Sequence, residues 1–584
     1  MRIVLTNSFL PADLGVDFVL TEEWRVAQAT SPDACLLEYS CSASERDLLI
    51  CRNREIMDQA FSIFAGAEDP TYVCGVSAAD IAGREIHQNI LLPIAHGLWL
   101  ADKFSKTDVY PKLAEFLSSV VIAIEAEAPE RYKQFERLTL QSFCFGLGID
   151  EPEIIYVHES RNRNLVTRYK TIRDIGFLPT PHTSRAIRTQ IRIGRLCFAL
   201  RGIASSHRKL VTFHYNPTAA FQDDVINQNR SLRLVAEPTS RRQALRMLVR
   251  GDALLEMPQR LFENYPPVPL ELSRTVLFGT DVSALAHGPI SDLLAVYVQY
   301  LKDMIPRVTK MMERQTVCAV YVPYETPPHV RLFLRVAALH GLPTFSTTDG
   351  YPLSPEVISC HSFAADHALA WSPYIAETHI GTGHDCVTVV GNPAAASTWQ
   401  PIRPSLHSTS QASLNVLVGG RGPDFSYFNE CRSAAEAYLE TVVNAITRAG
   451  IKRVPILKLH PSDHAEAYRE LPRSQLVTIA KSRLLGDLFE STDVFITPES
   501  TALFEALASG VACVYVASEC TLAGEPFASD PWLQARTAHS EDELVAILQN
   551  HDLLFELVPH GWLERYYSVR PSTATDRILG VVRG

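Results

Sequence analysis

The sequence of 584 residues lacks an apolar run long enough to cross a bilayer. It also lacks the long hydrophobic region and small-residue cleavage site of a signal peptide, so we expect a cytoplasmic protein. Its twelve cysteines form no CxxC pair and have no histidine partner at zinc-ligand spacing, which predicts reduced core residues. The formal net charge of -11 argues against general nucleic-acid binding.

Internal repeats and low-complexity tracts are also missing, and apolar strands alternate with helical segments along almost the whole chain. A long helical region is predicted at residues 78–104, and a strand at 317–322 is flanked by helices at 290–312 and 329–339. This alternation predicts parallel sheets with covering helices. The length predicts two to four domains, because one hydrophobic core does not grow to this size.

Two hydroxyl residues, Ser500 and Thr501, stand where an apolar strand turns into a helix. The strand at 494–496 ends at a Thr-Pro pair, and a helix-favouring run continues to Gly510. Free backbone N–H groups and the helix dipole favour an anion at such a place, and the two hydroxyls add donors. The alternative is ordinary N-capping of the helix. The pattern therefore predicts a phosphate site if other anion-binding residues lie nearby.

A second anion-binding pattern lies about forty residues upstream. An apolar strand ends in Lys458, His460 and Pro461, and the proline keeps the preceding residues extended, so that the lysine and the histidine point the same way. A single histidine is most often a packed or capped residue. Beside a lysine, and at the strand edge where open α/β sheets bind ligands, it is a candidate anion contact. Gly419, Gly420 and Gly422 form a glycine-rich turn after a strand, without GxGxxG spacing, which predicts a close backbone approach to a ligand.

Basic residues dominate the segment 161–209, which contains a single acidic residue. Arg185, Arg188, Arg192 and Arg195 follow helical spacing and would share one helix face. A solvated helix face is one interpretation. The other is contact with an anionic membrane surface or with an anionic, lipid-linked acceptor.

The C-terminal half, with its Lys-Leu-His-Pro strand followed by a Ser-Thr pair, resembles the nucleotide-binding domain of GT-B glycosyltransferases that build bacterial surface polysaccharides. Within that group it is similar to sialyltransferases, polysialyltransferases and capsule or O-antigen Kdo transferases, which use CMP-activated sugars. The resemblance covers roughly residue 290 to the C-terminus. It implies that His460, Ser500 and Thr501 hold the CMP phosphate and ribose. These families also carry an acidic-acidic-Gly motif with a catalytic Asp, and Asp349-Gly350 matches its last two members.

The expected chemistry divides the residues between two tasks. Lys458, His460 and the Ser-Thr pair would stabilise the nucleotide leaving group. Asp349 would act on the acceptor hydroxyl as a base, or attack the anomeric carbon as a nucleophile, and both mechanisms stay open. Glu325 is a second acidic candidate, and Glu505, one turn into the helix after the Ser-Thr pair, is a candidate contact for a ribose hydroxyl. No DxD tripeptide stands in a suitable loop, so neither a metal nor a cofactor is expected beyond the nucleotide sugar.

The resemblance implies an α/β protein of GT-B type, with two Rossmann-like domains whose parallel sheets face an interdomain cleft. The leading function is transfer of a sugar, Kdo or another nonulosonate, from a CMP donor to a glycan or lipid-linked glycan acceptor, with peripheral contact with the inner membrane as a candidate. Three alternatives remain: a CDP-glycerol-type phosphotransferase or UDP- or GDP-sugar transferase, a sugar-nucleotide epimerase, and a glycan-binding module with a decayed site. The expected parts are residues 1–395, an acceptor-side α/β domain with helical insertions; 396–413, a linker; 414–560, a nucleotide-sugar-binding domain; and 561–584, a C-terminal helix packing back.

Overall fold

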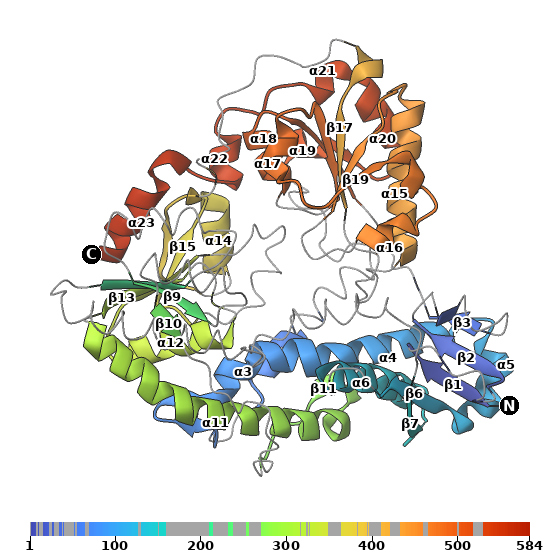
Figure 1. The fold of residues 1–584 in the computed structure, drawn as a ribbon, viewed down its shortest axis with the longest axis vertical. Helices are drawn as coiled ribbons and strands as arrows, with labels where there is room; N and C mark the ends of the chain where they lie inside the picture. The colour runs from blue at the N-terminus through green and yellow to red at the C-terminus, as the bar shows by residue number, and fades with distance from the viewer. Residues whose placement is uncertain are drawn as a thin grey trace.

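The computed structural model contains three parallel sheets and the helices that cover them (Figure 1). The described residues are 2–7, 10, 14, 16–22, 26–27, 34–37, 39, 52, 55–64, 69–126, 130–149, 151–158, 209–213, 232–236, 253–255, 270–315, 317–322, 325, 327–347, 364–381, 384–393, 395, 410–420, 432–459, 465–498, 502–517 and 530–583.

The first sheet has five strands in the order β3-β2-β1-β6-β7, and every neighbouring pair is parallel. Ile3, Val4 and Leu5 of the central strand are fully buried, as expected for a parallel strand covered on both faces. The strands are β1 (Ile3–Thr6), β2 (Phe18–Thr21), β3 (Ala34–Leu36), β6 (Val121–Glu125) and β7 (Glu153–Val157).

A long helical layer packs beside this sheet. α3, the π-helical segment η1 and α4 follow one another from residue 78 to 105, which confirms the helical region predicted at 78–104. α6 packs so closely on α4 at Gly97 that an ideal Cβ there would lie 2.2 Å from the Thr139 carbonyl oxygen, which explains the glycine. His96 on α4 reaches the end of β2, where its Nε2 lies 2.5 Å from Glu22 Oε1. The helices are α3 (Ala78–Ile86), η1 (His87–Leu91), α4 (Leu92–Ser105), α5 (Tyr110–Leu113), η2 (Ala114–Ser119) and α6 (Glu130–Gly146).

The second sheet has seven parallel strands in the order β10-β9-β8-β13-β14-β15-β16. Its strand β13 has the bounds predicted from the sequence. The long helix α11 and the helix α12 share one hydrophobic core with the first sheet and its helices. The elements are β8 (Lys209–Phe213), β9 (Leu232–Ala236), β10 (Ala253–Leu255), β13 (Val317–Val322), β14 (Thr344–Thr347), β15 (His367–Ala370), β16 (Val387–Val389), α11 (Ser283–Gln315), α12 (Pro328–Leu339) and α14 (Pro373–Gly381).

Two short antiparallel hairpins accompany these sheets. Their strands are β4 (Tyr72–Val73) with β5 (Val76–Ser77), and β11 (Val276–Leu277) with β12 (Thr280–Asp281).

The third sheet has six parallel strands in the order β19-β18-β17-β20-β21-β22. Its strands are β17 (Val416–Gly420), β18 (Ile456–Leu459), β19 (Thr478–Ala480), β20 (Val494–Thr497), β21 (Ala512–Val516) and β22 (Thr537–Ala538). The helices that accompany it are η5 (Gln411–Ser413), α15 (Arg432–Arg448), α16 (Ala465–Arg469), η6 (Ser474–Leu476), α17 (Leu485–Phe489), α18 (Ala502–Ala508), α19 (Pro531–Gln534), α20 (Glu541–Gln549) and α21 (His551–Leu554).

The last residues return to the seven-stranded sheet (Figure 1). The sequence pattern predicted one helix here, but the structure has two, because Arg570 with φ 34° and Pro571 interrupt the helical path. Ile578 and Leu579 of the second helix are buried against that sheet. The elements are α22 (Trp562–Tyr566), η7 (Pro571–Thr573) and α23 (Ala574–Arg583).

The predicted α/β class with parallel sheets is confirmed. Residues 1–395 carry two of the three parallel sheets, so the described part of the chain has one more parallel sheet than the two that the expected architecture contains. Within the described ranges, the helices include none with the length and apolar character that a bilayer-crossing segment requires.

Candidate functional site

The strand order of the six-stranded sheet defines one edge as the candidate ligand site. Numbered by their order in the chain, its strands run 3-2-1-4-5-6, which is the order of a dinucleotide-binding Rossmann sheet. The direction of strand addition reverses between β17 and β20. In sheets of this kind, ligands bind at the carboxyl ends of the strands beside the reversal. The predicted residues Gly420 and Lys458 lie at this edge, on β17 and β18.

The two glycines that end β17 have a packing role. An ideal Cβ on Gly419 would lie 2.8 Å from Thr497 Oγ1, and one on Gly420 would lie 2.8 Å from Tyr468 Oη. Tyr438 also donates a hydrogen bond of 2.8 Å from its hydroxyl to the Gly419 carbonyl oxygen. The neighbouring side chains therefore require glycine at both positions, and both lie inside the strand rather than in the turn after it.

Thr497 was missed as a site residue by the sequence analysis. It ends β20 beside the strand reversal and is fully buried. Its Oγ1 has no hydrogen-bond partner in the described part of the chain. An unpaired buried hydroxyl costs about 1–3 kcal/mol, so a group that supplies the missing bond would bind favourably here. In the sequence, Thr497 is a polar residue at the end of an apolar strand, a pattern that predicts the end of the strand and no ligand contact.

Lys458 lies on β18 directly across from Gly419. Its ammonium group donates hydrogen bonds of 2.9 Å to the Leu459 carbonyl oxygen and 3.2 Å to the Lys481 carbonyl oxygen. The side chain thus carries its positive charge along the carboxyl edge of β18 and β19. A cation in this position can contact a negatively charged ligand at the same edge.

Glu505 lies on α18, the helix that follows β20. Burial raises the pKa of its carboxyl group above the ordinary value of 4.5. Burial also raises the pKa of the Tyr567 hydroxyl, and the negative charge of Glu505 raises it further, while a hydrogen bond from Asn392 acts in the opposite direction. The carboxyl group therefore lies near the segment where α22 ends and the chain returns to the seven-stranded sheet, and in its protonated form it can donate as well as accept a hydrogen bond.

Glu325 follows β13 in the seven-stranded sheet and is 6% exposed. Its Oε2 accepts hydrogen bonds of 2.9 Å from Ala364 N and 3.1 Å from Ala365 N. Burial raises the pKa of this carboxyl group, against the opposing charge of Arg331. These contacts give Glu325 a structural task, which is to hold the residues that lead into β15. β13 lies beside β8 where this sheet also reverses its order, so the residue stands at a second candidate edge.

The seven-stranded and six-stranded sheets are joined through buried side chains. Trp371 and Ile375, after β15, share a hydrophobic cluster with Phe504 of α18. The Ser372 hydroxyl donates a hydrogen bond of 3.1 Å to the carbonyl oxygen of Tyr566, at the end of α22. The contact positions α18, and with it Glu505, relative to the seven-stranded sheet.

Several predicted site residues lie outside the described residues. Among the residues that the structure does describe, there is no group of three or more His, Cys, Asp or Glu side chains suited to a metal ion. The predicted residues outside the description are Asp349, His460, Pro461, Ser500, Thr501, Arg185, Arg188, Arg192 and Arg195.

Comparison with known proteins finds no matching family model and no matching curated protein. Among solved structures, the chain is similar to MurG of Acinetobacter baumannii, with 14% identity over 65% of this chain and 99% of that one, at a TM-score of 0.39. It is similar to the UDP-GlcNAc 2-epimerase of Methanocaldococcus jannaschii, with 10% identity over 64% and 99% of the two chains, at a TM-score of 0.38. It is also similar to a variant of the wall teichoic acid polymerase TagF soaked with CDPG, with 12% identity over 72% and 96%, at a TM-score of 0.35. The similarity to these GT-B-type enzymes is distant, and the fold class stated above rests on the strand orders of this chain.

Proposed function

We propose that the protein is a glycosyltransferase that binds a nucleotide-activated sugar at the carboxyl edge of the six-stranded sheet. The observation that carries the proposal is the strand order of this sheet together with the residues at its reversal. Gly419 and Lys458 face each other on adjacent strands, and the unpaired hydroxyl of Thr497 lies beside the glycine. A cation and a free hydroxyl beside a strand reversal are suited to a nucleotide phosphate.

In the proposed donor complex, Lys458, His460 and the Ser500-Thr501 pair contact the phosphate, next to Gly420 and Pro461. These groups stabilise the negative charge that develops on the phosphate oxygen as the bond to the anomeric carbon breaks. Glu505, whose carboxyl pKa is raised by burial, contacts the ribose. The Lys-Leu-His-Pro strand and the Ser-Thr pair favour CMP as the nucleotide and Kdo or another nonulosonate as the sugar.

The proposed catalytic residue is Asp349, two residues beyond the end of β14. As a base it takes the proton of the acceptor hydroxyl while the acceptor oxygen attacks the anomeric carbon and the nucleotide leaves. As a nucleophile it forms a glycosyl ester that the acceptor hydroxyl then displaces. Glu325 is the second acidic candidate. A lipid-linked glycan is the proposed acceptor, with the basic segment 161–209 as the candidate contact to the membrane surface.

A thermal-shift panel of CMP, CDP, UDP and GDP tests the donor assignment, because a ligand that binds the folded state alone raises the melting temperature. We expect CMP to give the largest shift and the His460→Ala variant to lose it. The Asp349→Ala variant should keep the CMP shift and lose sugar transfer.

Each other outcome has a separate meaning. A shift with UDP or GDP but not CMP contradicts the CMP assignment and favours the corresponding sugar transferase or an epimerase. A CDP shift with release of CMP from CDP-glycerol would identify a phosphotransferase. No shift with any nucleotide would favour a glycan-binding module.

A further inference from the structure

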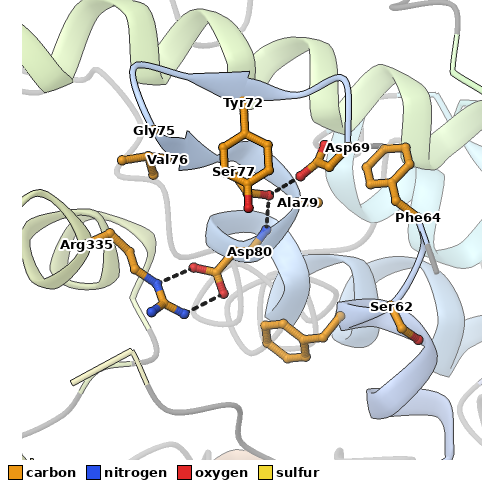
Figure 2. A pocket seen from close by; sticks show the side chains of 11 residues that line it. Ser62, Phe64, Asp69, Tyr72, Gly75, Val76, Ser77, Ala79, Asp80 and Arg335 are labelled. Atoms are coloured by element: carbon orange, nitrogen blue, oxygen red, sulfur yellow. Dashed lines mark hydrogen bonds and ion pairs between the residues drawn. The ribbon is translucent and has the colours of Figure 1, made fainter. Parts of the chain in front are cut away.

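Outside the six-stranded sheet the structure has a pocket of about 490 Å³, whose lining side chains are drawn in Figure 2. It is lined by Phe61, Ser62, Phe64 and Asp69, by the β4–β5 hairpin, by the start of α3 and by Arg335 of α12. A volume of this size is within the range of small-molecule sites, about 300–1,000 Å³. None of its lining residues belongs to the six-stranded sheet.

One wall of the pocket is a fixed ion pair. Arg335 donates from Nε to Asp80 Oδ2 at 2.7 Å and from its terminal nitrogen to Oδ1 at 3.1 Å, and Arg331 donates to Oδ1 at 2.5 Å. Burial acts to raise the pKa of Asp80, but the two guanidinium groups outweigh it and lower the pKa to about 2. Arg335 is 35% exposed, so its remaining N–H groups are available to a ligand in the pocket.

The opposite wall carries a second carboxylate with fixed orientation. Asp69 Oδ1 accepts hydrogen bonds of 2.8 Å from Thr71 N and 2.6 Å from the Thr71 hydroxyl. Its Oδ2 accepts a hydrogen bond of 2.5 Å from the Ser77 hydroxyl. The same hydroxyl caps α3 by accepting a hydrogen bond of 3.0 Å from Asp80 N. Figure 2 shows Asp69 and Arg335 on opposite sides of the pocket. The pocket therefore offers directed polar groups from two sides.

Aromatic side chains supply the apolar surface. Tyr72 projects from the hairpin and is 60% exposed, although it lines the pocket. Phe61 and Phe64 line the same pocket, and the Arg331 guanidinium lies 5.1 Å from the Phe61 ring centroid. An exposed aromatic ring beside fixed polar groups is suited to a ligand that has one apolar face and polar edges.

The charges of the pocket decide which ligand class fits. Asp69 and Asp80 are balanced by Arg335 and by Arg331 behind it. A phosphate or carboxylate ligand would face two carboxylates, and an ammonium ligand would face two guanidinium groups. A neutral ligand with several hydroxyl groups avoids both repulsions and can use the free guanidinium N–H groups and the remaining carboxylate lone pairs.

We propose that this pocket binds a neutral carbohydrate, with the Tyr72 ring against a C–H face of the sugar and Arg335 and Asp69 hydrogen-bonded to its hydroxyls. The site is separate from the donor edge and rests on its own lining residues. Under the proposed transferase function, its ligand is a segment of the glycan chain that the enzyme extends.

Saturation-transfer NMR with the full-length protein tests this proposal. The probes are neutral hexose and deoxyhexose methyl glycosides and disaccharides, with glucuronic acid and glucosamine as charged comparators. We expect saturation transfer to neutral sugars, and binding on the order of tenfold weaker in Tyr72→Ala, the loss expected for one aromatic contact. Tyr72→Phe should keep the binding. Tyr156→Ala removes another tyrosine of similar exposure, 54%, and should also leave binding unchanged.

The proposal is wrong if no neutral sugar receives saturation, if the charged comparators bind more tightly, or if Tyr72→Ala binds as the unmodified protein does. Thermal shifts with nucleotides, measured on the same variants, separate this site from the donor edge. Tyr72→Ala should keep any nucleotide shift, because none of the residues that line this pocket belongs to the six-stranded sheet. Loss of sugar binding with nucleotide binding intact therefore concerns the pocket alone.

Discussion

The hydroxyl of Thr497 occupies the space in which a side chain at position 419 would stand. An ideal Cβ on Gly419 lies 2.8 Å from Thr497 Oγ1, across the two strands where the six-stranded sheet reverses its order. Gly419→Ala should therefore lower the free energy of unfolding by about 1–3 kcal/mol, the usual cost of overpacking. Chemical denaturation measures this cost.

Gly419→Ala made in a Thr497→Ala background separates the clash with the Thr497 hydroxyl from the general effect of an alanine in the strand. We expect the cost of Gly419→Ala to be smaller there, because the hydroxyl that it would meet is gone. Equal costs in the two backgrounds would show that the Thr497 hydroxyl does not restrict position 419.

Thr497→Val should affect stability and ligand binding in opposite directions. The valine has nearly the same shape and removes a buried hydroxyl that has no partner among the described residues, so we expect the free energy of unfolding to rise by about 1 kcal/mol. Nucleotide binding should weaken, because the ligand loses a hydrogen bond. Denaturation and calorimetry on one preparation give both values, and a less stable variant would mean that the hydroxyl is paired in the folded protein.

The buried carboxyl group of Glu505 should make the free energy of unfolding depend on pH. Burial raises the pKa of its carboxyl group, so the folded protein favours the protonated form more than the unfolded chain does. The stability that this carboxyl contributes is present below its ordinary pKa of 4.5 and is lost as the pH rises through the higher folded value. Glu505→Gln should remove this loss, so that the variant gains stability relative to the unmodified protein as the pH rises to 7. Unfolding curves of both proteins across this pH range test the prediction. A stability difference between them that does not change with pH would contradict it.

The buried pair of His96 and Glu22 should be important for the first sheet. Both side chains are 5% exposed, and Asn7 donates to the second carboxylate oxygen at 3.2 Å. His96→Ala removes the imidazole that contacts this buried carboxylate, and we expect a loss of about 3–5 kcal/mol. The exposed pair of Lys106 and Asp102 at the end of α4 is the control, and Lys106→Ala should change stability by less than about 1 kcal/mol. Equal effects of the two substitutions would contradict a special role for the buried pair.

Much of the secondary structure could be predicted because both faces of a parallel strand are buried. β13 reads as an uninterrupted apolar run and was predicted with its observed bounds. The separate five-stranded sheet could not be predicted, because an apolar run does not record which strand pairs with it. The sequence also gives no prediction of the β4–β5 hairpin. Its turn uses Cys74 with φ 49° before Gly75 with φ 85°, and a cysteine in that conformation gives no turn signal.

The two candidate sites also differ in how far the sequence alone predicts them. The strand and helix pattern around β18 and β20 pointed to the donor edge, because each motif is local in sequence. The pocket of Figure 2 brings Asp69 and Tyr72 together with Arg335, which is more than two hundred residues away from them in the sequence. Each of these residues is ordinary in its own neighbourhood, so no sequence pattern marks the pocket. Thr497 was read as a strand stop, and its unpaired hydroxyl became visible only in the folded sheet.

The most direct test of a nucleotide site at this edge is calorimetric titration of CMP into two matched lysine variants. Lys458→Met removes the cation at the carboxyl end of β18, whereas Lys452→Met removes an exposed lysine before the amino end of the same strand. We predict that Lys458→Met weakens CMP binding about 10-fold to 100-fold, as expected for one charge-assisted hydrogen bond to phosphate, and that Lys452→Met leaves it unchanged. Equal affinities for both variants, or no CMP binding by the unmodified protein, would contradict the account.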